Sequence, residues 1–364
     1  QLTHAPTFGI AYMASAYGAT SPTSKRTNSG ISTNNGSPSN ARTKLLLLGQ
    51  RRSGKTSIKE VLFNGLGPKQ TFYLESTMRI VKHPYDTVIP LEIWDCPGNA
   101  TVESLGAPLS QFSALVFVID IRDLYKQPIS KLVEFIVAAS HDNPQLLIEI
   151  FVHKAERLQD DDKIESFRQI QERVQDNLME RDCEQVLYNF YLTSIYDHSL
   201  NEAFSKVLHK LIYPTQLEVL ERLLNSYCAN CSLPKAFLFD VASRLYVATD
   251  ASPVDTATHN LCCDYIQMLS SFRPLYRTPS STAERTQTGT ADPESSADAP
   301  PRFYPSAAVS LSSSSPGTTL TYHLMTPHLA LLSLVPTGVY EGRRGLFEYN
   351  VVFVREGVQE ICEA

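Results

Sequence analysis

The sequence lacks the excess of basic residues that nucleic-acid-binding proteins usually carry. Its 364 residues include 32 Lys and Arg against 38 Asp and Glu, which gives a formal net charge of -6. We therefore expect no nucleic-acid partner. Cysteine is also scarce, and its count of seven is odd. An odd count at irregular spacing does not suit a disulfide framework, so we expect a reducing, cytoplasmic setting.

Long apolar runs are missing as well. The longest lies around Leu329 to Val335 and is interrupted by Ser333, whereas a membrane-spanning helix needs about 20 apolar residues. We therefore expect no direct membrane insertion, and any membrane location would come through partners. A hydrophobic fraction of 43% is nevertheless typical of a globular protein, and the length allows two ordinary domains.

Two stretches lack any helical or strand periodicity. Residues 1–42 are rich in Ser, Thr, Asn, Gly and Ala, and we expect them to form a disordered tail. Residues from about 278 to 319 are dense in Ser, Thr, Pro and Ala. Because apolar periodicity resumes on both sides of this second stretch, we expect a disordered insertion within a folded domain.

Residues 49–56 read Gly-Gln-Arg-Arg-Ser-Gly-Lys-Thr and fit the phosphate-binding pattern G-x-x-x-x-G-K-[ST] without a mismatch. They follow the apolar run Leu45–Leu48, as expected for a loop between a buried strand and a helix. In such a loop the backbone N–H groups converge on a phosphate, and the helix N-terminus adds partial positive charge. Lys55 is expected to reach the β- and γ-phosphates, and the Thr56 hydroxyl to bind Mg²⁺. The expected nucleotide-contacting residues of this loop are Arg51, Arg52, Ser53, Gly54, Lys55, Thr56 and Ser57.

Strand-like and helix-like stretches alternate through residues 43–213. Several strands are apolar on both faces, which is typical of central strands covered by helices. The order predicts an α/β domain with a mostly parallel, doubly wound sheet and its ligand at the carboxyl ends of the strands. The predicted strands are Lys44–Leu48, Met78–Lys82, Val88–Trp94, Ala114–Asp120, Leu146–His153 and Val186–Leu192, and helices are expected after Gly54, Gln127, Asp161 and His198. The second and third strands are expected to be antiparallel, joined by a turn at residues 83–86.

A different pattern occupies residues 214–364 and predicts a small α+β domain without evident catalytic residues. The predicted elements are, in order, a helix (Leu217–Tyr227), two strands (Ala236–Asp240 and Leu245–Thr249), a helix (Thr258–Phe272), strand-like runs at Thr321–His323, Leu329–Val335 and Phe347–Val352, and a final helix.

A second nucleotide-sensing motif follows the phosphate loop. Asp95-Cys96-Pro97-Gly98 fits D-x-x-G at the end of a predicted strand. Asp95 is expected to hold Mg²⁺ through a water, and the Gly98 N–H to detect a γ-phosphate. Thr77 lies between the first helix and the next strand. It is either a further Mg²⁺ ligand or an exposed loop threonine, and its spacing does not decide between them.

Two further loops fall where small GTPases bind the guanine base. His153-Lys154-Ala155-Glu156 stands where Asn-Lys-x-Asp is usual. Lys154 can lay its alkyl stem along the base, and Glu156 keeps the carboxylate with one extra methylene. At Ser194 and Ile195, which follow the last predicted strand, a backbone N–H is expected to meet the base carbonyl.

Other combinations of reactive residues favour structural roles. Asp197, His198 and Ser199 are adjacent in sequence and cannot form a hydrolase triad, whereas Ser199-x-x-Glu202 predicts a helix capping box. Two cysteine pairs, Cys228 with Cys231 and Cys262 with Cys263, lie in helical segments without nearby histidines, which favours packing over zinc binding.

Together these motifs resemble the Rag GTPases, and among them the RagC/RagD type, which has fungal counterparts. The resemblance runs from about residue 44 to residue 364, apart from the Ser/Pro-rich insertion. The matching runs are Gly49–Lys55, Leu74–Thr77, His153-Lys154, Phe190–Ser199, Lys235–Asp240 and Ala248–Asp255.

The resemblance implies that GTP or GDP binds with Mg²⁺ and that the second domain is a roadblock-type fold forming a heterodimer with a RagA-like GTPase. It also implies a location on the vacuolar or lysosomal surface through a lipidated scaffold complex, and signalling of amino-acid sufficiency to the TORC1 kinase. In this family the GDP-bound form of this subunit, paired with a GTP-bound partner, is the signalling state.

Asn99 departs from the family pattern. Small GTPases usually carry Gln after D-x-x-G, where it orients the attacking water, and Asn is one methylene shorter. We therefore expect slow hydrolysis of GTP to GDP that depends on a GTPase-activating protein, with Asn99 and Lys55 as the catalytic positions. The segment from Asn99 to Phe112 also looks shortened.

Two other functions remain open from the sequence. Asn99 and Glu156 also suit a nucleotide-bound scaffold that no longer hydrolyses GTP. A P-loop metabolic kinase is a third reading, but it would require an arginine-bearing lid and a substrate-binding acid, and residues 214–364 offer neither clearly.

Overall fold

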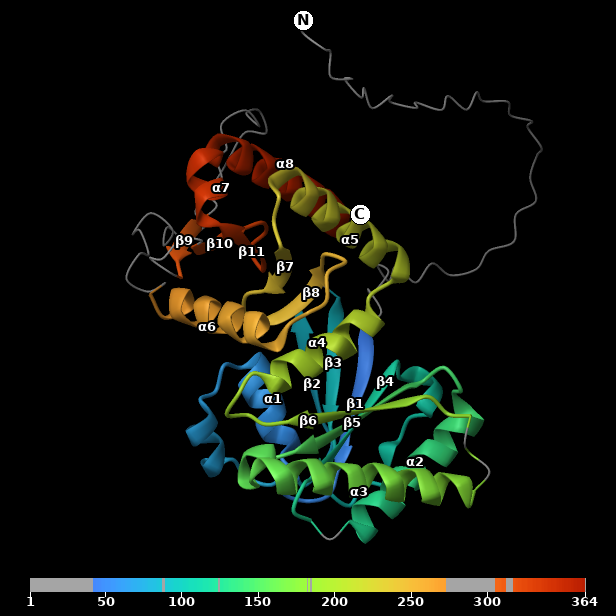
Figure 1. Ribbon diagram of the computed structural model, residues 1–364. Coiled ribbons are helices and arrows are strands. Elements are labelled where there is room, and N and C mark those ends of the chain that lie inside the picture. Colours follow the sequence, from blue (N-terminus) through green and yellow to red (C-terminus); the bar gives the residue numbers. More distant parts are fainter. Residues whose placement is uncertain are drawn as a thin grey trace, which may run out of the picture. The chain divides into compact units, whose positions relative to one another are not determined.

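The computed structural model describes residues 42–86, 89–123, 125–181, 183, 185–272, 305–311 and 317–363. Residues 1–41 of the predicted N-terminal tail and most of the predicted insertion lie outside these residues. Two β-sheets organise the described part of the chain (Figure 1). No helix within it is long and apolar enough to cross a membrane.

The first sheet has the strand order β2-β3-β1-β4-β5-β6 and is parallel except for β2, which is antiparallel to β3. This confirms the predicted mostly parallel α/β sheet. Its strands are β1 (Thr43–Gly49), β2 (Val81–Asp86), β3 (Pro90–Asp95), β4 (Ala114–Asp120), β5 (Leu147–His153) and β6 (Tyr188–Thr193).

Alternate leucines of β1 explain why helices cover both faces of this sheet. Leu45 and Leu47 are buried on the face covered by α1 (Lys55–Phe63) and α4 (Ser199–Leu211). Leu46 and Leu48 are buried with residues of α2 (Lys126–Asp142) and α3 (Asp160–Met179). Successive side chains of a strand point to opposite faces, so a fully apolar strand requires both covers.

The turn predicted at residues 83–86 is wrong, because these residues belong to β2. Pro84 suggested a turn, since proline cannot donate a backbone hydrogen bond. β2 is an edge strand of the sheet, however, and a proline is tolerated on an edge.

The second sheet has the order β8-β7-β11-β10-β9 and is antiparallel throughout, which confirms the predicted α+β arrangement. Helices α5 and α8 share a core with one face of this sheet, and α6 shares a core with the other. The elements are α5 (Pro214–Cys231), β7 (Lys235–Asp240), β8 (Leu245–Thr249), α6 (Thr256–Phe272), β9 (Ser306–Ser310), β10 (Thr318–Leu324), β11 (Leu329–Pro336), α7 (Thr337–Gly342) and α8 (Arg344–Glu363).

Two predictions for this region are wrong. The strand expected at Phe347–Val352 is part of α8, where the buried Phe347, Val351, Val354 and Val358 recur at helical spacing. A short apolar run does not separate a strand from a buried helix segment. The predicted insertion also extends too far, because β9 lies inside it and pairs with β10.

Cys262 and Cys263 behave as core residues rather than metal ligands. The expected lack of nearby histidines is wrong, because His259 Nε2 on the same helix lies 3.6 Å from Cys263 Sγ. Cys262 and Cys263 on α6 are fully buried, and burial raises the pKa of the Cys263 thiol to about 12. A thiol must ionise to bind zinc, so this environment disfavours it.

Candidate functional site

The predicted site residues converge because four parallel strands end at the same edge of the first sheet. Gly49 ends β1, Asp95 ends β3, His153 ends β5 and Thr193 ends β6. Loops that follow the carboxyl ends of parallel strands meet in space, which is where open α/β sheets bind ligands.

The phosphate loop takes a shape that requires glycine at two of its positions. Gly49 has φ 141° and Gly54 has φ 108°, both in the region that disfavours other residues. A Cβ atom on Gly49 would lie 2.2 Å from the Val118 carbonyl oxygen. Lys55 Nζ donates to the carbonyl oxygens of Gly49 and Gln50, each at 2.9 Å. The loop therefore curls around the ammonium group.

The pKa of Lys55 is lowered to about 8, mainly by burial; the nearby Lys131 contributes to the lowering, and Asp95 partly offsets it. A buried ammonium with few counter-charges is stabilised by an anion at hydrogen-bond distance. The buried Lys55 ammonium therefore favours phosphate binding to the loop.

Three oxygen-bearing side chains meet beside Lys55. Thr56 Oγ1 lies 2.8 Å from Asp95 Oδ2 and 2.9 Å from Thr77 Oγ1, and Thr77 Oγ1 lies 3.1 Å from the same carboxylate oxygen. Asp95 Oδ1 is buried without a hydrogen-bond partner among the described residues. Oxygen ligands, one of them a carboxylate, suit Mg²⁺. Thr77 is thus half-buried beside the other two predicted metal ligands, within a mostly exposed loop, and its role in holding Mg²⁺ stays a prediction.

The D-x-x-G loop packs directly on the phosphate loop. A Cβ atom on Gly98 would lie 2.4 Å from the backbone nitrogen of Arg51, so only glycine fits there. Asn99 follows in an exposed turn. In place of a long helix, the next residues form two short 3₁₀ turns, Glu103–Leu105 and Leu109–Gln111.

Glu156 is held in place by the following loop. Ser194 Oγ donates to Glu156 Oε2 at 2.7 Å and accepts from the Tyr196 N–H at 3.0 Å. The Ser194 N–H donates to Ser199 Oγ at 2.9 Å. Since that N–H is already engaged, the Ile195 N–H is the better candidate for contact with a base.

Lys154 links the loop expected to contact the base to the phosphate loop. Its Nζ donates to the Arg52 carbonyl oxygen at 2.6 Å and to Asp120 Oδ2 at 2.7 Å, while its backbone has φ 65°. The alkyl stem is thereby stretched between the two halves of the site. Sequence reasoning missed Asp120, whose only signal was its position at the end of β4.

His153 lies behind the phosphate loop. It is 1% exposed, and its Nδ1 lies 3.0 Å from Thr193 Oγ1. A Cβ atom on Gly54 would lie 2.6 Å from its ring. Burial lowers the pKa of His153 to about 3, so the ring stays neutral and supports the loop from beneath. The other predicted contact residues differ in exposure: Ser53 is buried, Gly54, Ser57 and Ile195 are half-buried, and Arg51 and Arg52 are exposed.

The predicted capping box at Ser199 is wrong, although α4 does begin there. The N-cap residue is His198, without a side-chain cap hydrogen bond, and the Ser199 N–H donates to Asp197 Oδ1 at 2.9 Å. The Ser199 hydroxyl oxygen instead accepts a hydrogen bond from the Ser194 N–H. His198 Nε2 lies 2.7 Å from Asp264, so these residues do not form a triad.

Comparison with known proteins agrees with this geometry. Residues 44–266 match the family model described as the Gtr1/RagA G protein conserved region. The chain belongs to the Gtr/Rag family of GTPases. Membership implies guanine-nucleotide binding.

Individual relatives place this Gtr/Rag chain nearer one branch. It is 38% identical to GTP-binding protein gtr2 of Schizosaccharomyces pombe over 87% of this chain and 97% of that one. It is 37% identical to Ras-related GTP-binding protein C of Homo sapiens over 90% of this chain and 79% of that one. Similarity to GTP-binding protein GTR1 of Saccharomyces cerevisiae is lower, at 27% over 52% and 64%. These matches confirm the RagC/RagD type.

Proposed function

We propose that the chain is a guanine-nucleotide switch that pairs with a RagA-like GTPase. The observation that carries this proposal is the meeting of Lys55, the Thr56–Thr77–Asp95 group and Glu156 at one sheet edge. These groups match a polyphosphate, its metal and a guanine edge respectively.

Thr56, Thr77 and Asp95 are the residues proposed to hold Mg²⁺. When bound, Mg²⁺ neutralises charge on the β- and γ-phosphate oxygens. Two residues would bind the nucleotide directly: the Lys55 ammonium donates hydrogen bonds to phosphate oxygens, and Glu156 accepts hydrogen bonds from the base. The Gly98 N–H and Thr77 lie on two separate loops that a γ-phosphate would draw inward.

In this arrangement the conformation of the two loops depends on whether GTP or GDP is bound. Loss of the γ-phosphate removes a few charge-assisted hydrogen bonds that hold the two loops. A partner that contacts these loops therefore distinguishes GTP from GDP. We propose that TORC1 signalling of amino-acid sufficiency uses this difference, with the dimer held on the vacuolar or lysosomal membrane by a lipidated scaffold complex.

The antiparallel sheet and its helices, in residues 214–364, are the proposed dimerisation domain of roadblock type, and residues 43–213 the GTPase domain. Support for pairing comes from the relatives, which include proteins of both the gtr2 and the gtr1 type. The test is co-expression with a RagA-like chain, purification of the complex and identification of the nucleotide on each subunit. Recovery of this chain as a nucleotide-free monomer would contradict the proposal.

Unassisted GTP hydrolysis is expected to be slow because Asn99 is short and lies in an exposed turn. Asn99→Gln should raise the single-turnover rate of the purified dimer, whereas Asn99→Ala should change it little. The measurement is phosphate release after rapid mixing with Mg²⁺. Unassisted hydrolysis by the unmodified protein as fast as in other small GTPases would refute the expectation.

Nucleotide binding is expected to take up a proton at alkaline pH. The pKa of Lys55 is about 8 in the free protein, mainly through burial. A phosphate stabilises the ammonium and raises this pKa, so affinity for GDP should fall as pH rises above about 8. Calorimetric titrations at about pH 8.5, in buffers of different ionisation enthalpy, measure the proton.

The matched control for proton uptake is Lys55→Arg, whose guanidinium stays charged at this pH. Any GDP binding that the arginine variant retains should be independent of the buffer. Heats that do not depend on the buffer for the unmodified protein would show that Lys55 is already protonated when free.

A second candidate function is a nucleotide-bound scaffold of the same dimer that does not hydrolyse GTP. The exposed turn position of Asn99 favours it. Nucleotide exchange separates the two: a switch releases GDP and responds to GTP, whereas a scaffold retains one nucleotide regardless of the supply.

A further inference from the structure

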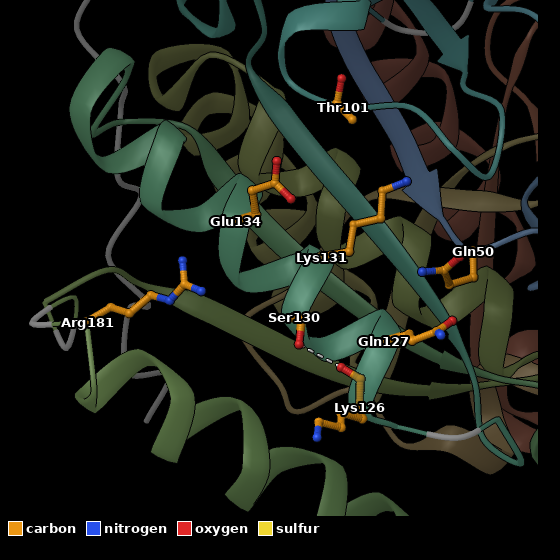
Figure 2. Close-up of a pocket in the computed structure, with 8 residues that line it drawn as sticks. All are labelled: Gln50, Thr101, Lys126, Gln127, Ser130, Lys131, Glu134 and Arg181. Carbon is orange, nitrogen blue, oxygen red and sulfur yellow. Dashed lines mark hydrogen bonds between the residues drawn. The ribbon is translucent and has the colours of Figure 1, made fainter.

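A pocket beside the nucleotide site has no role in the function proposed above. Its volume is about 770 Å³. Figure 2 shows side chains of α2 along one side, including Lys126, Lys131 and Glu134, with Arg181 approaching from the residues that follow α3. Gln50 of the phosphate loop and Thr101 of the D-x-x-G loop complete the lining. The pocket therefore touches the phosphate loop and the D-x-x-G loop.

The lining carries more positive than negative charge. Lys126, Lys131 and Arg181 face a single carboxylate, that of Glu134. No ion pair of the described residues includes Lys126, Lys131 or Arg181, although the Glu134 carboxylate lies near enough to stabilise the charge of Lys131. The pocket's volume of about 770 Å³ leaves room for more than one carboxylate. Three cations against one carboxylate complement an acidic ligand that carries several carboxylates.

Lys131 connects this pocket to the nucleotide. Its Nζ donates to the Gly98 carbonyl oxygen at 2.7 Å, and the N–H of the same residue is the proposed γ-phosphate sensor. The close approach of Gly98 to the Arg51 backbone shows that the loop is held against the phosphate loop. A carboxylate in the pocket would compete with the Gly98 carbonyl for the Lys131 ammonium.

We propose that this pocket binds an acidic segment of a partner protein, and that binding of this segment lowers the affinity of the chain for GTP relative to its affinity for GDP. This inference rests on the proposed nucleotide switch. An occupant that engages Lys131 releases Gly98 from the phosphate loop, which matters only when a γ-phosphate is present. By linkage, GTP must weaken binding of the acidic segment by the same factor.

The probe for the test is a fluorescein-labelled hexaglutamate peptide, with hexaglutamine as the uncharged control. Anisotropy measures its binding to the full chain loaded with GDP or GTP. The expected result is saturable binding that is weaker to the GTP form by about tenfold, a typical allosteric coupling. The peptide should also speed the release of GTP more than that of GDP.

Variants locate the effect. The double variant Lys126→Glu, Arg181→Glu should lose peptide binding while keeping nucleotide binding. The matched control is Arg168→Glu, an exposed charge reversal on α3 outside the pocket, which should keep both. Lys131→Ala should release GTP faster without peptide and respond no further to it.

Three outcomes would overturn the inference without contradicting the nucleotide site. One is that the peptide shows no saturable binding to a chain that binds GDP normally, and another is that it binds without changing the rate of GTP release. The third outcome is that Arg168→Glu loses as much peptide binding as the double variant does. Failure to bind either nucleotide would instead overturn the proposed function together with this inference.

Discussion

Lys55→Ala is expected to abolish GTP binding and to weaken GDP binding strongly. The substitution removes an ammonium that donates to two loop carbonyls and would reach two phosphates. Each hydrogen bond to a charged group contributes about 1.5–3 kcal/mol, so two phosphate contacts correspond to a loss of about a hundredfold or more in affinity. Titration of the purified chain with fluorescent GDP and GTP measures this.

The matched control is Lys59→Ala, another buried lysine on α1, which interacts with Glu60 and His83 instead of the phosphate loop. It should reduce stability while leaving the Kd for GTP within a few-fold. Thr56→Asn should impair the metal group and leave a GDP-bound or empty protein. If Lys55→Ala kept normal affinity for GTP, the assignment of residues 49–56 as the phosphate loop would be wrong.

Glu156→Gln is expected to reverse the base preference from guanine to xanthine. Guanine presents two N–H donors to the carboxylate, whereas xanthine presents one donor and one carbonyl acceptor, which an amide can match. Loss of a charge-assisted bond and creation of a donor facing a donor should weaken GDP binding by about a hundredfold. Competition between GDP and XDP for the purified chain measures the preference.

Ser194 fixes the orientation on which this reversal depends. Its hydroxyl accepts from the Tyr196 N–H and donates to Glu156 Oε2, so it would hold the amide oxygen and leave the amide nitrogen free for the base. Glu156→Asp is the control that keeps the carboxylate and should still prefer GDP. Unchanged GDP affinity in Glu156→Gln would show that Glu156 does not contact the base.

The sequence predicted the parts of the site that share a strand end. Asp95, His153 and Ser194 each follow a recognisable apolar strand, and parallel strands bring their carboxyl ends together. Contacts that long side chains make away from these predicted motifs were not predictable. Lys131 reaches Gly98 from α2, and Lys154 reaches Asp120, and neither pairing leaves a local pattern.

The errors in the fold have equally local causes. Pro84 imitated a turn because an edge strand tolerates a proline that a central strand would not. The run around Phe347 was too short to separate a strand from a helix. The sequence analysis missed β9 because its alternate residues are half-buried at most. No alternation of buried apolar residues therefore distinguishes it from the Ser-rich residues around it.

The central claim is that the sheet edge formed by residues 49–56, Thr77, Asp95 and Glu156 binds a magnesium–guanosine polyphosphate. Calorimetric titration of the nucleotide-free full chain with GDP, GTP and ADP, each with and without Mg²⁺, tests it directly. We expect tight binding of both guanine nucleotides, dependence of GTP binding on Mg²⁺, and no measurable binding of ADP. Equal affinity for ADP, or affinity for GTP that is indifferent to Mg²⁺, would contradict the account.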